Sequence, residues 1–292
     1  MHLSRTDDFS EQLDALADRV GLGAVLGDLD RRLRRTFAPC WSLHRAWTWD
    51  SADRRDERWW PQGVSVAPGG RHVAVSWYAK DGGSRVSFLD LRSRRYRHVE
   101  LVRPVEDGFE PLRVHAGGLA WHGTRLYVAA TKAGLWGCDT GDVVRGAEGY
   151  RLPVRYRLAP SEAFRFSFVG LDSASVPPRL VLGEYGGARG GTRRLAHVAV
   201  DGGAVELIDG GVVRAQGAVR VEDRWYVTAS HGTRTPGSVW SGPAGALREH
   251  RHAVPVGPED LAYDGQSDRL WTVTEHPRKR WVLSIRRSRF GG

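Results

Sequence analysis

Five apolar segments of this chain share one pattern, and each is followed by a turn and a second strand-like segment. Aligning these segments on Gly63, Gly118, Gly170, Gly217 and Asp260 gives spacings of roughly 43–55 residues. A repeat of this length, built from several strands, is typical of the blades of a β-propeller. We therefore expect an all-β fold, a five-bladed β-propeller. A six-bladed ring with one degenerate unit is the alternative.

The two ends of the repeat region indicate how such a ring closes. The last unit has no strand-like segment after residues 281–285, whereas residues 42–49 look like a strand and precede the first unit without a partner. Pairing these two segments would remove two exposed sheet edges. The sequence therefore predicts a propeller over residues 40–292, in which an N-terminal strand closes the last blade.

Residues 1–39 follow a different pattern. Apolar side chains recur at helical spacing in two short stripes, one over residues 9–20 and one over residues 25–37. Asp7, Asp8 and Ser10 are available to cap the first stripe. This pattern predicts a short N-terminal helical pair, an extension that packs on the rim of the propeller. A helix that binds a partner is the alternative.

The charge of the chain needs care before a partner is inferred from it. The formal net charge is +9, and 40 of the 43 basic residues are arginine. Such a strong preference for arginine is typical of the codon usage of a GC-rich genome, and the arginines are spread along the chain. We therefore expect a solvated basic surface and no nucleic-acid partner.

Other features bound the location of the protein and its redox chemistry. No apolar stretch reaches 18 residues, so we expect no membrane partner. The first 20 residues lack the charged and then apolar layout of a secretory signal, which favours a cytoplasmic location. Cys40 and Cys138 have no metal-site spacing, and a disulfide between them stays open, as does the oligomeric state.

The polarity of propeller strands predicts where functional side chains gather. The start of each innermost strand and the end of the second strand lie at the same mouth of the central channel. Convergent polar groups with aromatic walls at such a mouth are typical of pockets that bind small molecules. The candidates at these positions are Trp60, Gln62, Trp77, Tyr78, His115, Lys132, Glu184, Tyr185, Gln216, His231, Glu259, Asp260 and Glu275.

Purely structural roles are the alternative for several candidates. Gln62 and Gln216 could tie neighbouring blades together through hydrogen bonds to the backbone, because buried amides need partners. Glu259 and Asp260 follow Pro258, where a carboxylate could cap free backbone N–H groups. The tryptophans, apart from Trp60, suit packing between blades.

These residues favour an enzyme that acts on a small organic molecule by acid–base chemistry and needs no cofactor, such as a cyclase, lyase or hydrolase. Glu259 or Glu184 would be the base, because crowded carboxyl groups have raised pKa values, and His115 would be the proton donor or the oxyanion partner. Paired carboxylates would also suit a glycosidase. Ca²⁺ held by a channel lined with Asp and Glu is the alternative to a site without a cofactor.

The remaining candidates have binding roles in this interpretation. Four aromatic side chains would form the apolar walls: Trp60, Trp77, Tyr78 and Tyr185. The other substrate contacts would be Gln62, Lys132, Gln216, His231, Asp260 and Glu275. A propeller that binds a glycan or a peptide without catalysis is the alternative function, and in that case the aromatic side chains would dominate affinity.

Several stretches together resemble a group of actinobacterial propeller-like proteins of unassigned function, many of them predicted to be secreted. The stretches that carry the resemblance are Trp60-Pro61-Gln62-Gly63, Val114-His115-Ala116-Gly117-Gly118, Gly183-Glu184-Tyr185-Gly186 and Gly257-Pro258-Glu259-Asp260-Leu261. The resemblance covers about residues 40–286 and implies the fold but no reaction. An actinobacterial origin would make specialised-metabolite biosynthesis a reasonable setting. The helical extension departs from the group, which has a secretion signal there.

Overall fold

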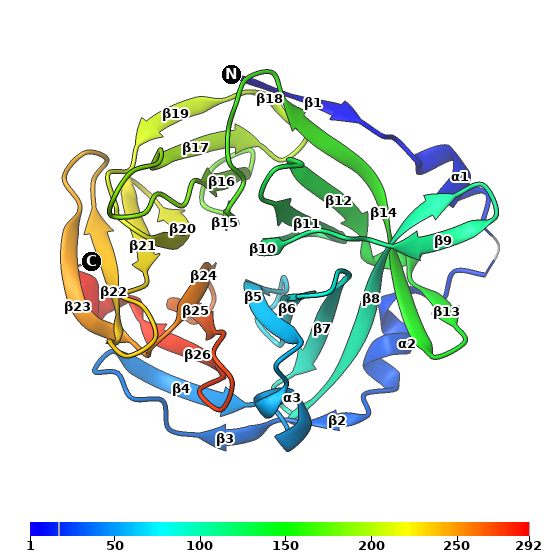
Figure 1. Cartoon of the computed structure of the whole chain (residues 1–292), viewed down its shortest axis with the longest axis horizontal. Coiled ribbons are helices and arrows are strands. Elements are labelled where there is room, and N and C mark those ends of the chain that lie inside the picture. Colours follow the sequence, from blue (N-terminus) through cyan, green and yellow to red (C-terminus); the bar gives the residue numbers. More distant parts are fainter. Residues whose placement is uncertain (17, 292) are drawn as a thin grey trace.

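The strands of this chain radiate from a common centre in a propeller-like arrangement (Figure 1). The computed structural model describes residues 1–16 and 18–291. Five innermost strands contact one another at the centre. They are β5 (Trp59–Val66), β10 (Ala116–His122), β15 (Phe168–Asp172), β20 (Ala215–Val221) and β24 (Pro258–Asp264). The fold is therefore all-β, as the sequence predicted.

Each innermost strand begins an antiparallel unit of four strands. The first unit continues with β6 (His72–Ala79), β7 (Ser84–Asp90) and β8 (Arg95–Val105). The second continues with β11 (Arg125–Ala130), β12 (Leu135–Asp139) and β14 (Gly149–Pro160). The third continues with β16 (Arg179–Gly183), β17 (Arg194–Ala199) and β19 (Glu206–Asp209). The fourth continues with β21 (Arg224–Ala229), β22 (Gly237–Gly242) and β23 (Arg248–Val254). The fifth has β25 (Arg269–Thr274), β26 (Trp281–Arg286) and β4 (Leu43–Thr48).

Two of these units are joined to each other by hydrogen bonds between their outer strands. Over residues 1–16 and 18–291, the strands form four sheets. The first two units share one sheet of 13 strands, because β8 and β14 pair in parallel from Val99 and Tyr150 to Val102 and Pro153. The chain also has smaller elements outside the four strands of each unit: α3 (Ser51–Arg55), β9 (Gly108–Pro111), η1 (Thr140–Asp142), β13 (Val144–Gly146), β18 (Gly203–Ala204) and η2 (Arg287–Phe290).

The strand β4 closes the ring. It pairs antiparallel with β26, with Thr48 opposite Trp281 and Leu43 opposite Ile285. The first strand of the repeat region thus completes the unit that the end of the chain begins, and the pairing expected from the two unmatched segments is present. Trp47 of β4 also stacks on Trp271 of β25, with ring centroids 5.7 Å apart.

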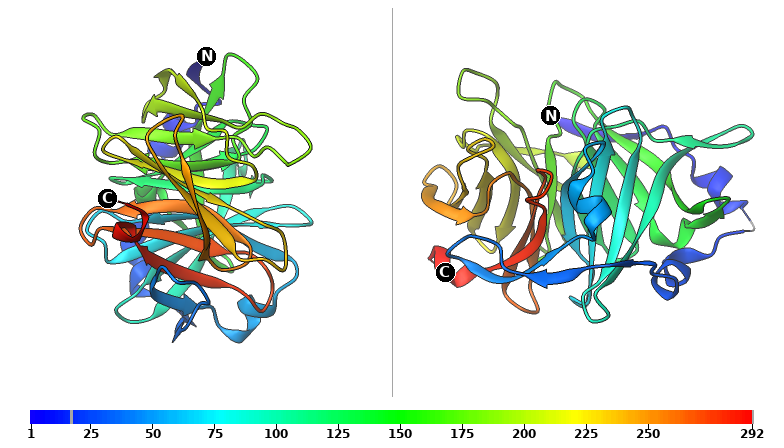
Figure 2. Two further views of the ribbon diagram at one scale, coloured as in Figure 1. Left: turned by 90° about the vertical axis from the view of Figure 1, so that its left-hand side faces the viewer. Right: turned by 60° about the horizontal axis from the view of Figure 1, so that its bottom comes forward.

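The N-terminal residues correct the prediction of a helical pair. The two expected helices are present but short, α1 (Ser10–Asp14) and α2 (Gly21–Gly27). They follow β1 (His2–Thr6) and precede β2 (Arg31–Arg32) and β3 (Arg34–Thr36). These strands pair with β14, β8 and β4, so the segment runs around the outside of the ring (Figure 2). The second apolar stripe was misread, because Leu33 lies between two strands and packs in the core at 4% exposure.

The repeated glycines lie where neighbouring innermost strands approach most closely. A Cβ on Gly118 would lie 2.3 Å from the backbone nitrogen of Val169, and one on Gly217 would lie 2.3 Å from that of Leu261. No side chain fits at such distances, so glycine lets the strands close around a narrow centre. The fifth unit has Asp260 at this position, and its fully buried carboxylate occupies the centre.

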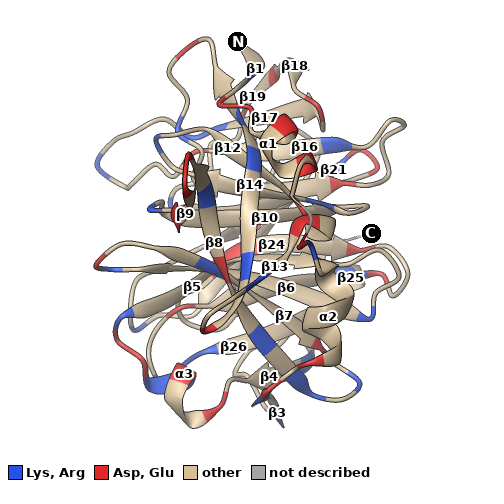
Figure 3. Cartoon of the chain, turned by 90° about the vertical axis from the view of Figure 1, so that its right-hand side faces the viewer, with Lys and Arg blue, Asp and Glu red and all other residues tan. Residues whose placement is uncertain are grey.

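Basic and acidic side chains are mixed on the surface. On the side of the ring that shows β8 and β14, positions of Lys and Arg and positions of Asp and Glu are both scattered over the ribbon (Figure 3). Cys40 and Cys138 are both free thiols and form no disulfide. In the described part of the chain, no helix has both the length and the apolar character needed to cross a membrane.

Candidate functional site

A small cavity lies where the innermost strands begin and the second strands end. Its volume is about 230 Å³. Its lining contains residues from every unit of the ring: Gln62, Tyr78, His115, Thr131, Arg165, Ser167, Tyr185, Gln216, Glu259 and Glu275. Strand polarity therefore brings together most of the side chains that the sequence placed at one mouth of the channel.

Irregular pairing of the innermost strands places polar residues at this cavity. The pairing register shifts next to Gln62 in β5, next to Gln216 in β20 and next to Glu259 in β24. A bulge adds an extra residue to one strand and changes the direction of its side chain, and bulges are frequent next to active sites. Without these bulges, strict alternation would determine which face of the blade each side chain occupies.

Two carboxyl groups meet in the cavity. Glu259 of β24 and Glu275, which directly follows β25, form a hydrogen bond with each other. Gln216 Nε2 donates to Glu259 Oε1 at 3.1 Å, and Gln62 Nε2 donates to Glu275 Oε2 at 3.1 Å. Because β20 and β5 lie on either side of β24, the two amides hold the carboxyl pair from both sides.

The surroundings of the pair favour a single shared proton. Burial, and then the negative charges of Glu275 and Asp260, raise the pKa of Glu259 well above its ordinary value. Burial also raises the pKa of Glu275, but the charge of His276 and the hydrogen bond from Gln62 oppose that rise. Two adjacent carboxylates do not both ionise readily. Of the two, Glu259 therefore has the more strongly raised pKa.

Neutral rings line the cavity beside this pair. His115 meets Tyr78 edge to face, with ring centroids 4.3 Å apart. Partial loss of water around its ring, and then the positive charge of Arg165, lower the pKa of His115. Burial and the two glutamates raise the pKa of Tyr78, so its hydroxyl keeps its proton. Both rings can therefore offer a hydrogen-bond donor to an oxygen of a bound molecule.

The pH dependence of stability provides a test of the raised pKa of Glu259. The folded chain holds this proton more tightly than the unfolded chain, in which a glutamate has a pKa of about 4.3. The stabilisation is therefore complete below that value and is lost as the pH rises through the folded pKa. We expect Glu259→Gln, which cannot ionise, to lose less stability between about pH 5 and pH 8, by about 1 kcal/mol or more.

Urea unfolding at several pH values between those limits measures the difference. The matched control is Glu110→Gln in β9, which removes an exposed carboxylate outside the cavity. Equal losses of stability in wild type and Glu259→Gln would contradict the raised pKa.

Glu184 does not belong to the carboxyl pair, which corrects its prediction as a catalytic base. Its side chain is buried and forms an ion pair with Arg194 at 2.8 Å. It also accepts a hydrogen bond from the backbone N–H of Arg165 at 3.0 Å. Burial alone would raise the pKa of Glu184, but the hydrogen bonds from Arg194 and Arg165 lower this pKa to about 2. Such a carboxylate is a weak base and instead anchors the loop before β15.

Two predicted contacts are buried away from the cavity. Trp77 is fully buried, packs edge to face on Trp49 with centroids 4.7 Å apart and donates its indole N–H to Ser87 at 2.7 Å. Asp260 is also fully buried and accepts backbone hydrogen bonds. Neither side chain lines the cavity. Trp77 is therefore wrong as a wall residue, and Asp260 is wrong as a substrate contact.

Three further predicted contacts, Trp60, Lys132 and His231, also lie outside the cavity, whereas Gln62, Tyr78, Tyr185, Gln216 and Glu275 line it. Trp60 is half-buried beside it, with the Lys80 ammonium 4.4 Å and the Arg280 guanidinium 5.6 Å from its ring centroid. His231 bonds Ser238 at 2.7 Å in the fourth unit, and Lys132 lines an adjoining cavity. The sequence analysis missed Arg165. Arg165 lies two positions before Ser167, in the extended segment that follows β14. This segment was the sequence signal that could have identified Arg165.

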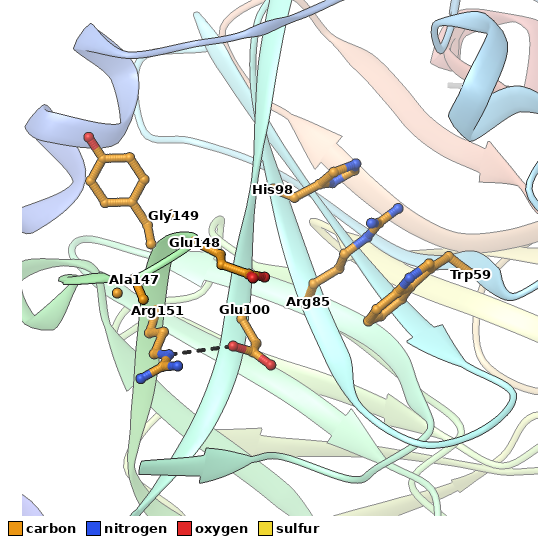
Figure 4. Close-up of a pocket in the computed structure, with 10 residues that line it drawn as sticks. Trp59, Arg85, His98, Glu100, Ala147, Glu148, Gly149 and Arg151 are labelled. Atoms are coloured by element: carbon orange, nitrogen blue, oxygen red, sulfur yellow. Dashed lines mark ion pairs between the residues drawn. The ribbon is translucent and has the colours of Figure 1, made fainter. Parts of the chain in front are cut away.

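A separate cavity of about 550 Å³ lies outside the centre, beside β8 and the hairpin of β13 and β14 (Figure 4). Three of its charged side chains form ion pairs: Arg151 pairs with Glu100 at 3.5 Å, and Arg85 pairs with Asp53, which lies outside the lining, at 3.1 Å. His98 also bonds Asp53 at 2.9 Å. This network connects α3 to the first unit. The candidate catalytic residues line the central cavity and not this one.

Within residues 1–16 and 18–291, no three His, Cys, Asp or Glu side chains are placed to hold a metal ion.

Comparison with known proteins gives no match by sequence and several distant matches by structure. No family model matches the sequence, and no curated protein matches it. Among solved structures, glutaminyl cyclase from Myxococcus xanthus is 16% identical with a TM-score of 0.47 and covers 88% of this chain and 97% of its own. A gluconolactonase from Xanthomonas campestris is 14% identical with a TM-score of 0.45 and covers 88% and 85%.

A GH43_1 enzyme from Xanthomonas citri is similar at the same level. It is 12% identical with a TM-score of 0.46, and the match covers 81% of this chain and 89% of the enzyme. Similarity of this degree concerns the course of the chain, so the chemistry of the cavity has to be argued from its own residues.

Proposed function

We propose that this protein is an enzyme that acts on a small organic molecule by acid–base chemistry in the central cavity. The observation that carries the proposal is the hydrogen-bonded pair of Glu259 and Glu275 with raised pKa values. Carboxyl groups mostly stay exposed to water, because burial disfavours their charge. Titratable groups that lie in a cleft and have perturbed pKa values are frequent at active sites. The volume of about 230 Å³ suits a small substrate.

The two glutamates have different roles in this proposal. Glu275 is the base, because it is ionised and its charge is supported by Gln62 and by His276, whose Nδ1 lies 3.5 Å away. Glu259 is the acid, because it keeps its proton at neutral pH. A proton removed from the substrate by Glu275 is matched by one donated from Glu259 to an oxygen of the substrate. The hydrogen bond between them then lets the proton return to Glu259.

This arrangement favours cyclisation, elimination or hydrolysis of a carbonyl compound over glycoside hydrolysis. Glycosidases hold their two carboxyl groups at least about 5 Å apart to admit the sugar or a water. Glu259 and Glu275 bond each other directly, so the sugar carbon has no place between them. Tyr78 and His115 are placed to bind an oxygen that gains charge during the reaction.

We further propose that the catalytic unit is a five-bladed ring. Five antiparallel units of four strands support this count, each beginning with one innermost strand. The parallel pairing of β8 with β14 joins two of them edge to edge without removing either unit.

The test of the function compares Glu→Gln variants on small substrates from three reaction classes. Lactones report hydrolysis, short hydroxy acids report cyclisation, and β-hydroxy carbonyl compounds report elimination. With the substrate that wild type turns over, Glu275→Gln and Glu259→Gln should each lower kcat by about 10²–10⁴-fold, as expected for loss of a general acid or base. Glu110→Gln is again the matched control and should keep the wild-type rate.

The rival function, binding without catalysis, predicts a different outcome. Wild type would turn over none of the compounds, and substitution of Tyr78 or Tyr185 would weaken ligand binding more than substitution of either glutamate. A kcat within twofold of wild type in both glutamate variants would also overturn the acid–base proposal.

A further inference from the structure

A larger and more open cavity adjoins the central one. Its volume is about 820 Å³, and it lies at the ends of β11, β14 and β16 on the side where the central cavity opens. Thr131 and Arg165 line both cavities, so the two meet at these side chains. A molecule seated in the central cavity can therefore extend past Arg165 into the larger one.

Some charged side chains of the larger cavity have an ion-pair partner among residues 1–16 and 18–291, and others have none. Arg157 pairs with Asp7 at 2.7 Å and Arg194 pairs with Glu184 at 2.8 Å. Its other carboxylate, Glu162, pairs with the N-terminal amine at 3.1 Å. Lys132 and Arg165 are exposed in this cavity, and neither forms an ion pair with any other described residue. Arg165, at the junction of the two cavities, and Lys132, in the larger cavity next to Thr131, thus carry uncompensated positive charges.

We propose that Lys132 and Arg165 bind an anionic group, a carboxylate or a phosphate, on the molecule that occupies the central cavity. The identification of this molecule as a substrate rests on the proposed function, whereas the anion site rests on the two cations alone. The ionised Glu275 repels an anion from the inner end of the cavity. The molecule is therefore oriented with its neutral reactive end toward Glu259 and Glu275 and its anionic end toward Lys132 and Arg165.

His115 provides a signal for occupation of this site. The positive charge of Arg165 contributes to the lowered pKa of His115, because it disfavours a second positive charge nearby. An anion bound by Arg165 offsets that charge, so the pKa of His115 should rise when the site is filled. This readout requires no turnover and no knowledge of the natural substrate.

The experiment titrates the full-length protein with inorganic phosphate at constant ionic strength and follows the imidazole signals by NMR. His115→Gln identifies the His115 signal by its loss. Phosphate should raise the pKa of His115 in a saturable way. Lys132→Gln and Arg165→Gln should each weaken phosphate binding by about tenfold, the usual effect of losing one hydrogen bond to a charged group. Binding of glutarate in place of phosphate tests the carboxylate form of the anion.

The matched control is Lys279→Gln. Lys279 is an exposed lysine in the loop after β25, which lies at the same mouth of the channel, but it lines neither cavity. Its loss should leave the affinity for phosphate unchanged. An equal weakening by Lys279→Gln would show diffuse attraction to a basic surface and would overturn the site, as would a His115 pKa that does not respond to either anion.

The failure of this inference is distinguishable from the failure of the proposed function. Glu275→Gln should still bind phosphate, because Glu275 does not contact the two cations. Retained turnover in Glu275→Gln with normal phosphate binding would leave the anion site in place and remove the acid–base role. Lost turnover in Glu275→Gln with no phosphate binding in wild type would do the reverse.

Discussion

A fragment of residues 51–292 should fail to fold and should aggregate. It lacks β4, which pairs with β26 from Thr48 and Trp281 to Leu43 and Ile285. Without β4, the outer edge of β26 is unpaired and the stack of Trp47 on Trp271 is lost. Unpaired strand edges are templates for association with other chains. Size-exclusion chromatography and circular dichroism of the fragment measure the effect.

A rescue variant shows that the cause is the lost pairing. Because Leu43 lies opposite Ile285, the beginning of β4 lies near the end of β26, and a short linker after residue 292 could lead into residues 37–50. This permuted chain should be monomeric and folded, although it also lacks residues 1–36 and is therefore less stable than the full-length chain. A folded, monomeric 51–292 fragment would contradict the role of β4, as would a permuted chain that aggregates like the fragment.

Removal of residues 1–36 alone should also be costly, although β4 remains. The N-terminal segment buries Leu3 at 1%, Leu13 at 0% and Val25 at 0% exposure against the outer strands. Each buried side chain of this kind contributes about 1.5–3 kcal/mol. The segment is thus part of the core and not a dispensable extension, and the sequence analysis underestimated its contribution.

Asp260→Ala should lower the free energy of unfolding by about 2–6 kcal/mol, because it leaves two buried backbone donors without an acceptor at about 1–3 kcal/mol each. Asp260 Oδ2 accepts from the backbone N–H of Val64 at 3.1 Å and of Leu119 at 2.8 Å. These donors belong to β5 and β10, so one carboxyl group links three innermost strands at the centre. Urea unfolding with two independent probes measures the loss.

Asp260→Asn is the matched control. It keeps the size of the side chain and one acceptor oxygen, and it removes the need to bury a charge, which burial disfavours strongly at this position. We expect Asp260→Asn to retain most of the stability that Asp260→Ala loses. If both variants unfold at the same urea concentration, the hydrogen bonds to Val64 and Leu119 do not hold the centre together.

The sequence predicted the site best where strand polarity alone decides position. Gln62, Gln216 and Glu259 were expected at one mouth because each begins an innermost strand, and all three line the central cavity. Trp77 was misplaced because neighbouring residues of a strand face opposite sides, so Tyr78 faces the cavity and Trp77 faces the core. The strand repeat specifies which end of the blade a residue occupies, but not which face.

Side-chain partners across loops were beyond the sequence. Glu184 and Arg194 lie ten positions apart, at the end of β16 and the beginning of β17, and no sequence pattern reveals their ion pair. The same holds for Arg165, whose loop crosses from the second unit to the third. In the N-terminal segment, the spacing of Leu29 and Leu33 suits a helix, but pairing with β8 and β4 overrides this local preference.

The pairing of β4 with β26 also sets the order of events during synthesis. Thr48 leaves the ribosome roughly 230 residues before its partner Trp281, which at typical rates of translation is roughly 10–50 s. Throughout that interval the nascent chain holds a strand whose final neighbour does not yet exist. The four earlier units can form as they emerge, but the ring becomes a closed structure only when nearly the last strand is made. A chaperone that shields β4 during this interval would therefore raise the yield of folded protein more than one that acts after release.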